Sequence, residues 1–187
     1  MAQVPGRPVC IDRYEASLAG GQPGQPDGTG VTAKAAARKG AVPAAMVSQR
    51  QAKVACANAG KRLCTRDEWV AACAGADGAR KYAYGHEKKP GLCHDRTLAR
   101  QRGSTQPLPA GSLAGCRTPE GVYDLSGNVW EWLADTDPTG RSASLIGAGY
   151  GNDDSHLGCS PDEHIGQPVE LQVSGVGFRC CTAQRGQ

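Results

Sequence analysis

The sequence predicts a folded, loop-rich domain of short helices and strands that disulfide bonds hold together. The 187 residues include 26 Gly and 12 Pro, about one residue in five, which exceeds average usage but stays below the range of disordered chains. Two capping boxes mark helix starts, and short strand patterns flank them. Nine cysteines are more than a reducing compartment usually holds without a metal or a redox cycle.

The N-terminal third mixes one strand pattern with loops. Residues 9–18 read VCIDRYEASL and begin with a period-two alternation, which predicts a short strand. Residues 20–30 are rich in Gly and Pro and predict a loop. The Ala- and Lys-containing residues 33–41 fit either a short helix or a solvated loop.

Two helices are predicted from their first turns. Ser48 with Gln51 forms a capping box, in which each side chain can bond the other's backbone amide, and the helix runs to about residue 58. Thr65 with Glu68 repeats this pattern for a helix over residues 66–74. A glycine follows each predicted helix end, at Gly60 and at Gly75.

Regular patterning fades over residues 76–120. A stretch of this length without structure in a compact domain is usually functional or cross-linked, and Cys93 and Cys116 flank its centre. Residues 129–133 then predict an aromatic strand with both tryptophans on one face, and residues 175–181 predict the last strand.

Composition disfavours several classes of protein. The net charge is only +3 and no run of four basic residues occurs, which is unlike a nucleic-acid-binding surface. No apolar stretch approaches the length of a membrane span. No two cysteines have the spacing of a zinc ribbon, so we expect disulfides. Because nine is an odd number, at least one cysteine stays free or pairs with another molecule. This predicts a secreted or periplasmic location, although residues 1–7 do not resemble a signal peptide.

Six further segments stand out in chain order: IDRYE (11–15), the V-S-x3-A-x3-C pattern (47–56), AGKRLCTRDEW (59–69), AYG (83–85), GVYDLSGNVWEW (121–132) and GFRC (177–180). In this order they resemble the formylglycine-generating enzyme family, also called sulfatase-modifying factors. The resemblance spans nearly the whole chain. It implies one α+β domain, loop-rich and C-type lectin-like, over residues 1–187, with a core covering about residues 9–182.

The same resemblance implies two long-range disulfides, Cys56–Cys180 and Cys73–Cys159. We expect Cys93–Cys116 as a third bridge. Three cysteines then remain. Antiparallel pairing of the first and last strands favours Cys10–Cys181, and Cys64–Cys181 is nearly as good a pairing.

Family members that oxidise a sulfatase cysteine use a Cys-x4-Cys pair that binds copper(I), which soft thiolates suit. The corresponding residues 149–158 contain no cysteine. We therefore expect a non-catalytic, extracytoplasmic binding or assembly module, monomeric, with an unknown protein or peptide ligand. The alternative is a copper-dependent oxidase that converts a sulfatase-type cysteine to formylglycine. A further alternative is a variable-loop receptor on the same fold.

The loop before Cys159 is the expected contact surface, because its residue types give contact area and hydrogen bonds at low entropic cost. Its candidates are Tyr150, Asn152, Asp153, Asp154, Ser155 and His156. A turn that only reverses the chain fits equally well. His156 and His164 lie close in sequence, which leaves a replacement metal site open.

The resemblance also implies a calcium site in the GVYDLSGNVWEW loop. Its ligands would be Asp124, Gly127, Val129 and Glu131. Two carboxylates with loop carbonyls between them can supply the hard oxygen ligands that Ca²⁺ takes. The competing interpretation is that Glu131 pairs with an arginine and Asp124 caps a turn. Copper is expected only with the oxidase alternative.

Overall fold

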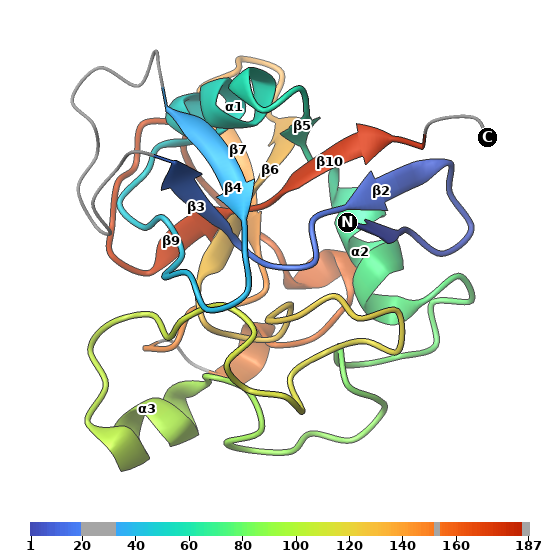
Figure 1. Ribbon diagram of the computed structural model, residues 1–187, viewed down its shortest axis with the longest axis vertical. Coiled ribbons are helices and arrows are strands. Elements are labelled where there is room, and N and C mark those ends of the chain that lie inside the picture. The colour runs from blue at the N-terminus through green and yellow to red at the C-terminus, as the bar shows by residue number, and fades with distance from the viewer. Residues whose placement is uncertain (20–32, 152–153, 185–187) are drawn as a thin grey trace.

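The computed structural model describes residues 1–19, 33–151 and 154–184, and Figure 1 shows a body of small sheets beside a loop-rich part. The first sheet has the strand order β1-β2-β10-β5, the second pairs β3 with β4, and the third has the order β8-β7-β6-β9. The strands are β1 (Ala2–Gln3), β2 (Val9–Ile11), β3 (Ala16–Ala19), β4 (Lys34–Ala37), β5 (Arg62–Leu63), β6 (Trp130–Thr136), β7 (Ser142–Ile146), β8 (Ile165–Pro168), β9 (Val176–Phe178) and β10 (Cys180–Ala183).

Both expected helices are confirmed together with their caps. Helix α1 (Gln49–Asn58) and helix α2 (Arg66–Ala74) each begin with a complete capping box. The third helix, α3 (Arg96–Arg102), was not expected, although Asp95 caps its start and Gly103 ends it in the left-handed region. Two short 3₁₀ turns, η1 (Asp154–His156) and η2 (Pro161–Glu163), complete the set in the described residues.

Two segments with strand patterns each contain parts of two strands, because the chain changes sheets within them. Residues 9–18 form β2 and then β3, which belong to different sheets, so they are not one strand. Residues 175–181 likewise divide at Arg179, since β9 pairs with β6 while β10 pairs with β2 and β5. Each division places buried charged side chains at the corner between two sheets.

Residues 33–41 contain strand β4, which neither interpretation of that segment included. Its four residues pair in register with β3, and Ala35 turns into the core. Small side chains suit this position because α1 packs directly against β4 (Figure 1). The loop expected over residues 20–30 lies outside the described residues.

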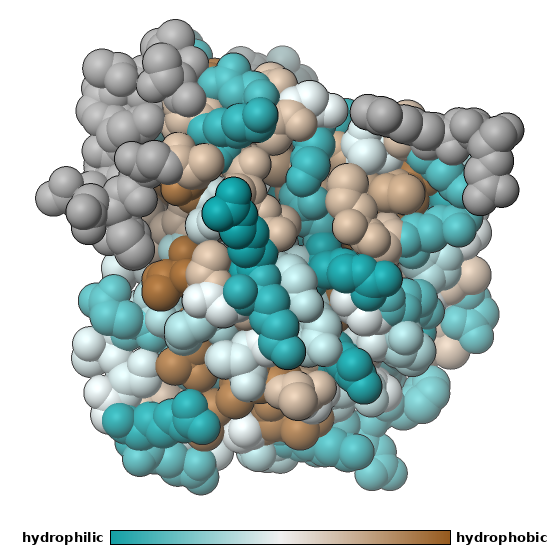
Figure 2. Space-filling view, viewed as in Figure 1, coloured by the Kyte–Doolittle hydropathy of each residue, from teal (hydrophilic) through white to brown (hydrophobic). Residues whose placement is uncertain are grey.

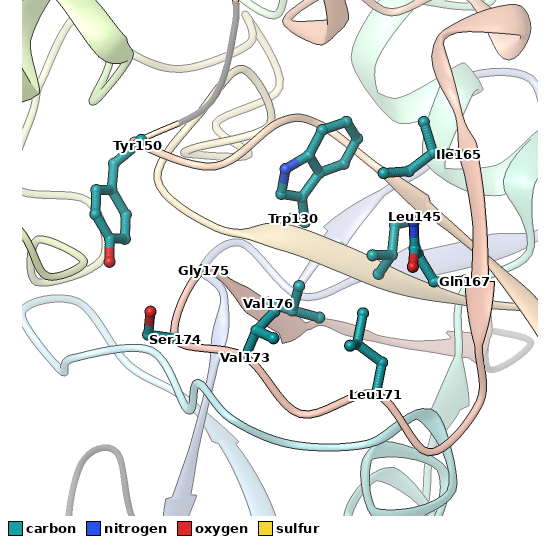
Figure 3. A pocket seen from close by; sticks show the side chains of 11 residues that line it. Trp130, Leu145, Tyr150, Ile165, Gln167, Leu171, Val173, Ser174, Gly175 and Val176 are labelled. Carbon is teal, nitrogen blue, oxygen red and sulfur yellow. The ribbon is translucent and has the colours of Figure 1, made fainter.

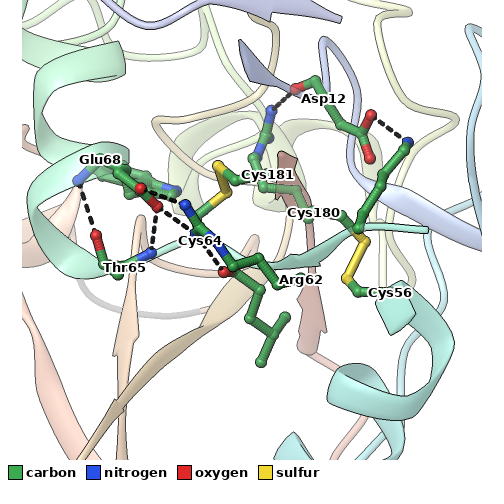
Figure 4. The surroundings of a disulfide bond; sticks show 12 residues. Asp12, Cys56, Arg62, Cys64, Thr65, Glu68, Cys180 and Cys181 are labelled. Atoms are coloured by element: carbon green, nitrogen blue, oxygen red, sulfur yellow. Dashed lines mark hydrogen bonds and ion pairs between the residues drawn. A yellow bond between two sulfur atoms is a disulfide. The ribbon is translucent and has the colours of Figure 1, made fainter. Parts of the chain in front are cut away.

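Four disulfides join segments that are distant in sequence. They are Cys56–Cys180, Cys64–Cys181, Cys73–Cys159 and Cys93–Cys116. Figure 4 shows the two bridges of β10 side by side, one to the end of α1 and one to the residue after β5.

The favoured Cys10–Cys181 pairing was wrong, and Cys10 is a free thiol. The strands β2 and β10 do pair antiparallel, but Cys10 stands opposite Thr182 while Cys181 stands opposite Ile11. Successive side chains point to opposite faces of a sheet, so the two sulfur atoms lie on different faces. Cys181 is therefore on the inner face, where it meets Cys64.

Two hydrophobic clusters form the core, on opposite faces of the third sheet. One holds Trp130, Trp132 and Phe178 with the inner face of α1. The other holds Trp69 of α2 with Leu125, Leu133 and the inner face of the first sheet. In the described part of the chain, no helix has the length and apolar character needed to cross a lipid bilayer.

Candidate ligand-binding site

Strand β6 presents different chemistry on its two faces. Trp130 and Trp132 point into one hydrophobic cluster, and the Trp132 indole donates a hydrogen bond of 2.8 Å to the Val47 carbonyl. Glu131 points the other way, toward α2 and Arg179. The alternation of side chains along β6 thus separates two sites. Trp130 and Trp132 belong to the apolar side, and Glu131 between them belongs to a buried ionic site.

The apolar site is a pocket of about 380 Å³ beside Trp130. Figure 3 shows Tyr150 and Ser174 toward one end, with Leu145, Ile165 and Gln167 toward the other. Its lining is mostly hydrophobic, with two polar side chains, a composition typical of small-molecule and side-chain pockets. The pocket residues are Trp130, Leu145, Tyr150, Gly151, Ile165, Gln167, Leu171, Val173, Ser174, Gly175 and Val176.

Tyr150, which is expected from the sequence as a contact residue, is largely buried. Only 8% of it is exposed, and its hydroxyl donates to the Thr105 carbonyl at 2.7 Å. Its ring stacks on His94 with the centroids 5.2 Å apart. Tyr150 therefore forms an ordered wall of the pocket and fixes the start of the loop that follows.

The rest of the expected contact loop is described only in part. Asn152 and Asp153 lie outside the described residues, and Asp154 begins the turn η1. Ser155 is exposed. His156 is half-buried, its ring centroid lies 5.5 Å from that of Trp130, and its Nδ1 has no hydrogen-bond partner in the described structure.

The two loop histidines have separate surroundings. The His164 ring contacts the Arg66 guanidinium at 3.1 Å and the Pro161 carbonyl at 2.7 Å, whereas His156 lies against Trp130. Within residues 1–19, 33–151 and 154–184, no three His, Cys, Asp or Glu side chains converge in a way that could hold a metal ion. The replacement metal site therefore gains no support from the geometry.

The ionic site centres on a buried pair between Glu131 and Arg179. The guanidinium donates two hydrogen bonds of 2.6 Å to the carboxylate, and each residue is 1% exposed. The Trp69 indole donates a third at 2.9 Å. Arg179 also donates to the carbonyls of Asp12 and Tyr123, so it joins the first sheet, the third sheet and the central loop. A bidentate, fully hydrogen-bonded pair is the arrangement that a buried charge needs.

Two further buried carboxyls lie near this pair. Asp124 accepts a 2.7 Å hydrogen bond from the Gly111 amide, and burial raises its pKa to about 6. Burial also raises the pKa of Glu15 well above its usual value, and the charges of Asp124 and Glu131 add to the effect. Asn128 donates to Glu15 at 2.6 Å and contacts His94 at 3.0 Å. Glu15, Asp124, Glu131 and Arg179 thus form a buried ionic cluster with three carboxyls and one cation.

The residues implied as calcium ligands fit that ion poorly as they stand. Both Glu131 oxygens already accept hydrogen bonds from Arg179, and one accepts a third from Trp69. Asp124 accepts from Gly111 and does not converge with two other acidic or histidine side chains in the described structure. The arginine occupies the role that a cation would have, which matches the competing interpretation. Calcium binding stays an expectation that the family resemblance alone carries, and a melting experiment can test it.

Sequence reasoning missed Glu15, Asn128 and Arg179 as parts of this cluster. All three lie within the segments that carry the family resemblance, IDRYE, GVYDLSGNVWEW and GFRC. A charged residue flanked by apolar ones, as in G-F-R-C, was the available signal, because such a residue must bury its charge beside a partner. Which residue is that partner depends on the fold, because Glu131 and Arg179 are far apart in the sequence.

Comparison with known proteins matches residues 9–184 to the sulfatase-modifying factor enzyme 1-like domain. A mouse protein, "Inactive C-alpha-formylglycine-generating enzyme 2", is 30% identical over 162 residues, 76% of this chain and 49% of the mouse protein. The formylglycine-generating enzyme of Streptomyces coelicolor is 31% identical over 150 residues, 65% of this chain and 46% of the enzyme. The chain spans about half the length of these curated relatives.

Among solved structures, PvdO from Pseudomonas aeruginosa aligns with a TM-score of 0.65 at 18% identity, over 95% of this chain and 81% of PvdO. This likeness confirms the expected α+β, formylglycine-generating-enzyme-like and C-type lectin-like fold. The domain match covers nearly the entire described chain. The chain belongs to the sulfatase-modifying factor family, whose relatives here include both an enzyme and a protein named as inactive.

Proposed function

We propose that this chain is a non-catalytic, extracytoplasmic binding module that takes an apolar group of a protein or peptide ligand into the Trp130 pocket. The observation that carries the proposal is the pocket itself, an apolar cavity of about 380 Å³ next to a segment from which the catalytic cysteine pair is missing. The fold is retained without the thiols that the family's oxidation requires.

The thiol inventory supports the non-catalytic part of this proposal. Eight of the nine cysteines are in disulfides, and Cys10 alone is free. Copper(I) needs soft ligands, and exchange with a substrate thiol needs a second nearby cysteine. Cys10 lies on β2 in the first sheet and does not line the Trp130 pocket. A relative named as inactive is consistent with the loss of this chemistry.

The lining of the pocket supports the binding part. Leu171, Val173 and Val176 form an apolar wall facing Trp130, and Val173 is 41% exposed at the rim. An apolar side chain placed here would remove hydrophobic surface from water at roughly 25 cal/mol per Å². Ser174 and Gln167 provide hydrogen-bonding groups that can orient a peptide backbone. Four disulfides suit a location outside the reducing cytosol.

Binding is tested with a display library of random 12-residue peptides selected on the purified protein. We expect the selected peptides to share an apolar residue and to lose at least tenfold in affinity with Val173→Asp. Val54→Asp is the matched control, because Val54 on α1 is equally exposed at 38% and lies outside the pocket. Selected peptides that ignore both substitutions, or a library that yields none, would contradict the proposal.

The oxidase alternative is supported by the catalytic relative from Streptomyces coelicolor. It is tested by mass spectrometry of a peptide that carries a sulfatase cysteine motif, incubated with the protein, copper(I) and O₂. We expect the peptide mass to remain unchanged. Conversion of the peptide cysteine to formylglycine would establish catalysis. Loss of that conversion in Cys10→Ser would identify Cys10 as the thiol that catalyses it.

A further inference from the structure

Helix α3 and the loop before it carry an unusual concentration of positive charge. Residues 80–102 contain seven basic and two acidic side chains, a net charge of +5, whereas the whole chain has a net charge of only +3. The basic residues are Arg80, Lys81, Lys88, Lys89, Arg96, Arg100 and Arg102. The charge asymmetry between this segment and the remainder therefore has the form of a local anion-binding surface.

The helix is held so that its arginines face solvent. Leu98 and Ala99 are buried against the domain, while Arg96, Arg100 and Arg102 are exposed. Arg96 and Arg100 are one turn apart, about 6 Å along the axis, and so lie on the same face. Figure 1 places α3 at the outer edge of the molecule, and Figure 2 shows a hydrophilic surface at that place.

Arg80 pairs with Glu120, but four of the other basic side chains have no ion-pair partner in the described structure. Arg96, Arg100, Arg102 and Lys89 make no ion pair with any described residue. The nearest acidic residue in sequence, Asp95, is buried and accepts hydrogen bonds from the amides of Leu98 and Gly91. Like charges one turn apart destabilise a helix slightly. The unpaired Arg96 and Arg100 therefore do not serve the stability of α3, which suggests a role in binding.

The loop before α3 is fixed close to the helix. The Gly91 amide bonds the Asp95 carboxylate at 2.7 Å, and the Leu92 amide bonds the Lys89 carbonyl at 3.0 Å. The Cys93–Cys116 disulfide joins the same turn to the loop around residue 116. Lys89 is thereby kept near the start of α3, so the backbone that carries it is already ordered before an anion binds.

We propose that Lys89, Arg96, Arg100 and Arg102, called the α3 cationic surface, bind a linear anionic polysaccharide. Guanidinium groups pair with carboxylate, sulfate or phosphate in a bidentate manner, and arginine supplies three of the four cations. The neighbouring Gln101 and Gln106 are exposed and offer hydrogen bonds to sugar hydroxyls. None of the four cations lines the Trp130 pocket, so this surface is separate from the proposed ligand site.

Other anionic partners fit the surface less well. No large hydrophobic side chain is exposed in residues 80–103, so an inserting membrane or an apolar protein interface would lack an anchor there. The aromatic rings of that segment, Tyr82 and Tyr84, stack on each other, whereas single-stranded nucleic acid is usually held by aromatic side chains that stack on its bases. Charge and hydrogen bonding without apolar contact are what a polysaccharide offers.

The test measures heparin-oligosaccharide binding by calorimetry at several salt concentrations. The variant Arg96→Gln/Arg100→Gln/Arg102→Gln is compared with Arg38→Gln/Lys39→Gln/Lys53→Gln, which removes the same charge from exposed positions elsewhere. We expect the α3 variant to lose at least tenfold in affinity and much of its salt dependence. The control should stay within twofold, and both variants should melt like the unmodified protein.

Parallel titrations identify the class of partner. Poly-glutamate, vesicles of anionic phospholipid and single-stranded DNA are measured under the same conditions as heparin and polygalacturonate. Tighter binding of any of the first three would overturn the assignment to a polysaccharide. Equal losses in the two triple variants would show a response to net charge alone and would also overturn it, as would the absence of heparin binding at low salt. The Val173→Asp variant should bind heparin normally, which keeps this result independent of the pocket.

Discussion

The sheet-containing body and the segment 84–121 are stabilised in different ways. The body contains both hydrophobic clusters and three of the four disulfides. No residue of 84–121 belongs to either cluster. That segment is instead attached to the body by polar side chains of the central loop, Asn128 and Asp124, and one disulfide cross-links it internally. The comparison teaches that a loop-rich fold can be ordered by buried hydrogen bonds where apolar residues are scarce.

The largest expected effect comes from removing both bridges of β10 from the body. Replacing Cys56, Cys64, Cys180 and Cys181 by Ala removes these two bridges, whereas replacing Cys93 and Cys116 removes one bridge that closes 23 residues. With the Cys73–Cys159 bridge intact, the two β10 bridges close covalent loops of about 30 and about 10 residues, and the chain-entropy model gives a combined loss of about 6 kcal/mol, against about 3 kcal/mol for Cys93–Cys116. Denaturant unfolding of the two variants measures this order. Equal losses would mean that disulfides stabilise the body and the segment 84–121 to the same extent.

Breaking the buried ion pair should cost nearly as much. Glu131→Ala leaves the Arg179 guanidinium buried without its carboxylate, and we expect a loss of about 3–5 kcal/mol in unfolding free energy. Glu170→Ala is the control, because its pair with Arg50 is exposed and should contribute less than about 1 kcal/mol. Similar values for the two variants would refute a structural role for the buried pair.

Asn128→Ala should loosen the segment 84–121 more than the body. The amide side chain bonds the backbone of Leu108 twice and also contacts Glu15 and His94. Its loss leaves buried groups unsatisfied, at about 1–3 kcal/mol. Hydrogen exchange should accelerate around residue 108 and not in β6 or β7. Uniform acceleration across both regions would show that they unfold as one unit.

The raised pKa of Asp124, about 6, gives the link between the regions an unusual pH dependence. A carboxyl whose pKa is higher in the folded state binds protons more tightly there, so its contribution to stability is full below about pH 4 and is lost as pH rises through 6. Asp124→Asn keeps an oxygen for the Gly111 amide and suits the left-handed backbone at this position.

The Asp124→Asn variant should therefore match the unmodified protein at pH 4 and exceed it above pH 6, by about 1–3 kcal/mol. The lowered pKa values of Glu68 and Glu120 act in the opposite direction but cancel in the difference between the two proteins. The pKa of Glu15 falls when the Asp124 charge is removed, which adds to the gain of the variant above pH 6. A difference that grows toward low pH would reverse the assigned sign.

The smallest expected effect is that of calcium. Because Arg179 already neutralises Glu131, we expect the same melting temperature in saturating Ca²⁺ and in chelator. A site filled at a hundred times its Kd would instead stabilise the protein by about 2.7 kcal/mol. Such a shift, removed by Asp124→Asn, would establish the family's calcium site and require Arg179 to release Glu131.

Local signals predicted local structure, and failed where the chain changes sheets. The capping boxes at Ser48 and Thr65 placed α1 and α2, because each box satisfies the helix's own amides. Helix α3 had the same kind of signal in Asp95 and Gly103, but only seven residues and no apolar stripe. Strand β4 was missed since an alanine run has no alternation, and it becomes a strand only by pairing with β3.

The candidate site was less predictable than the fold. The sequence places Trp130 on one face of an aromatic strand, and in the structure it both packs in the core and forms a wall of the pocket. Tyr150 was assigned to a contact surface, yet its hydroxyl and ring are both engaged internally. Residue type indicates what a side chain can do, whereas its role depends on neighbours such as Thr105 and His94 that no sequence spacing identifies.

The adjacent bridges of Cys180 and Cys181 have a consequence for the order in which the protein can be made. β10 lies inside the first sheet, and its two cysteines cross-link residues 56 and 64, synthesised more than a hundred residues earlier. A ribosome-bound chain lacking β10 would expose the sulfur atoms of Cys56 and Cys64 as free thiols a few residues apart. Native oxidation of that region therefore follows completion of residues 180–183, and earlier bond formation between those thiols would have to be undone by exchange.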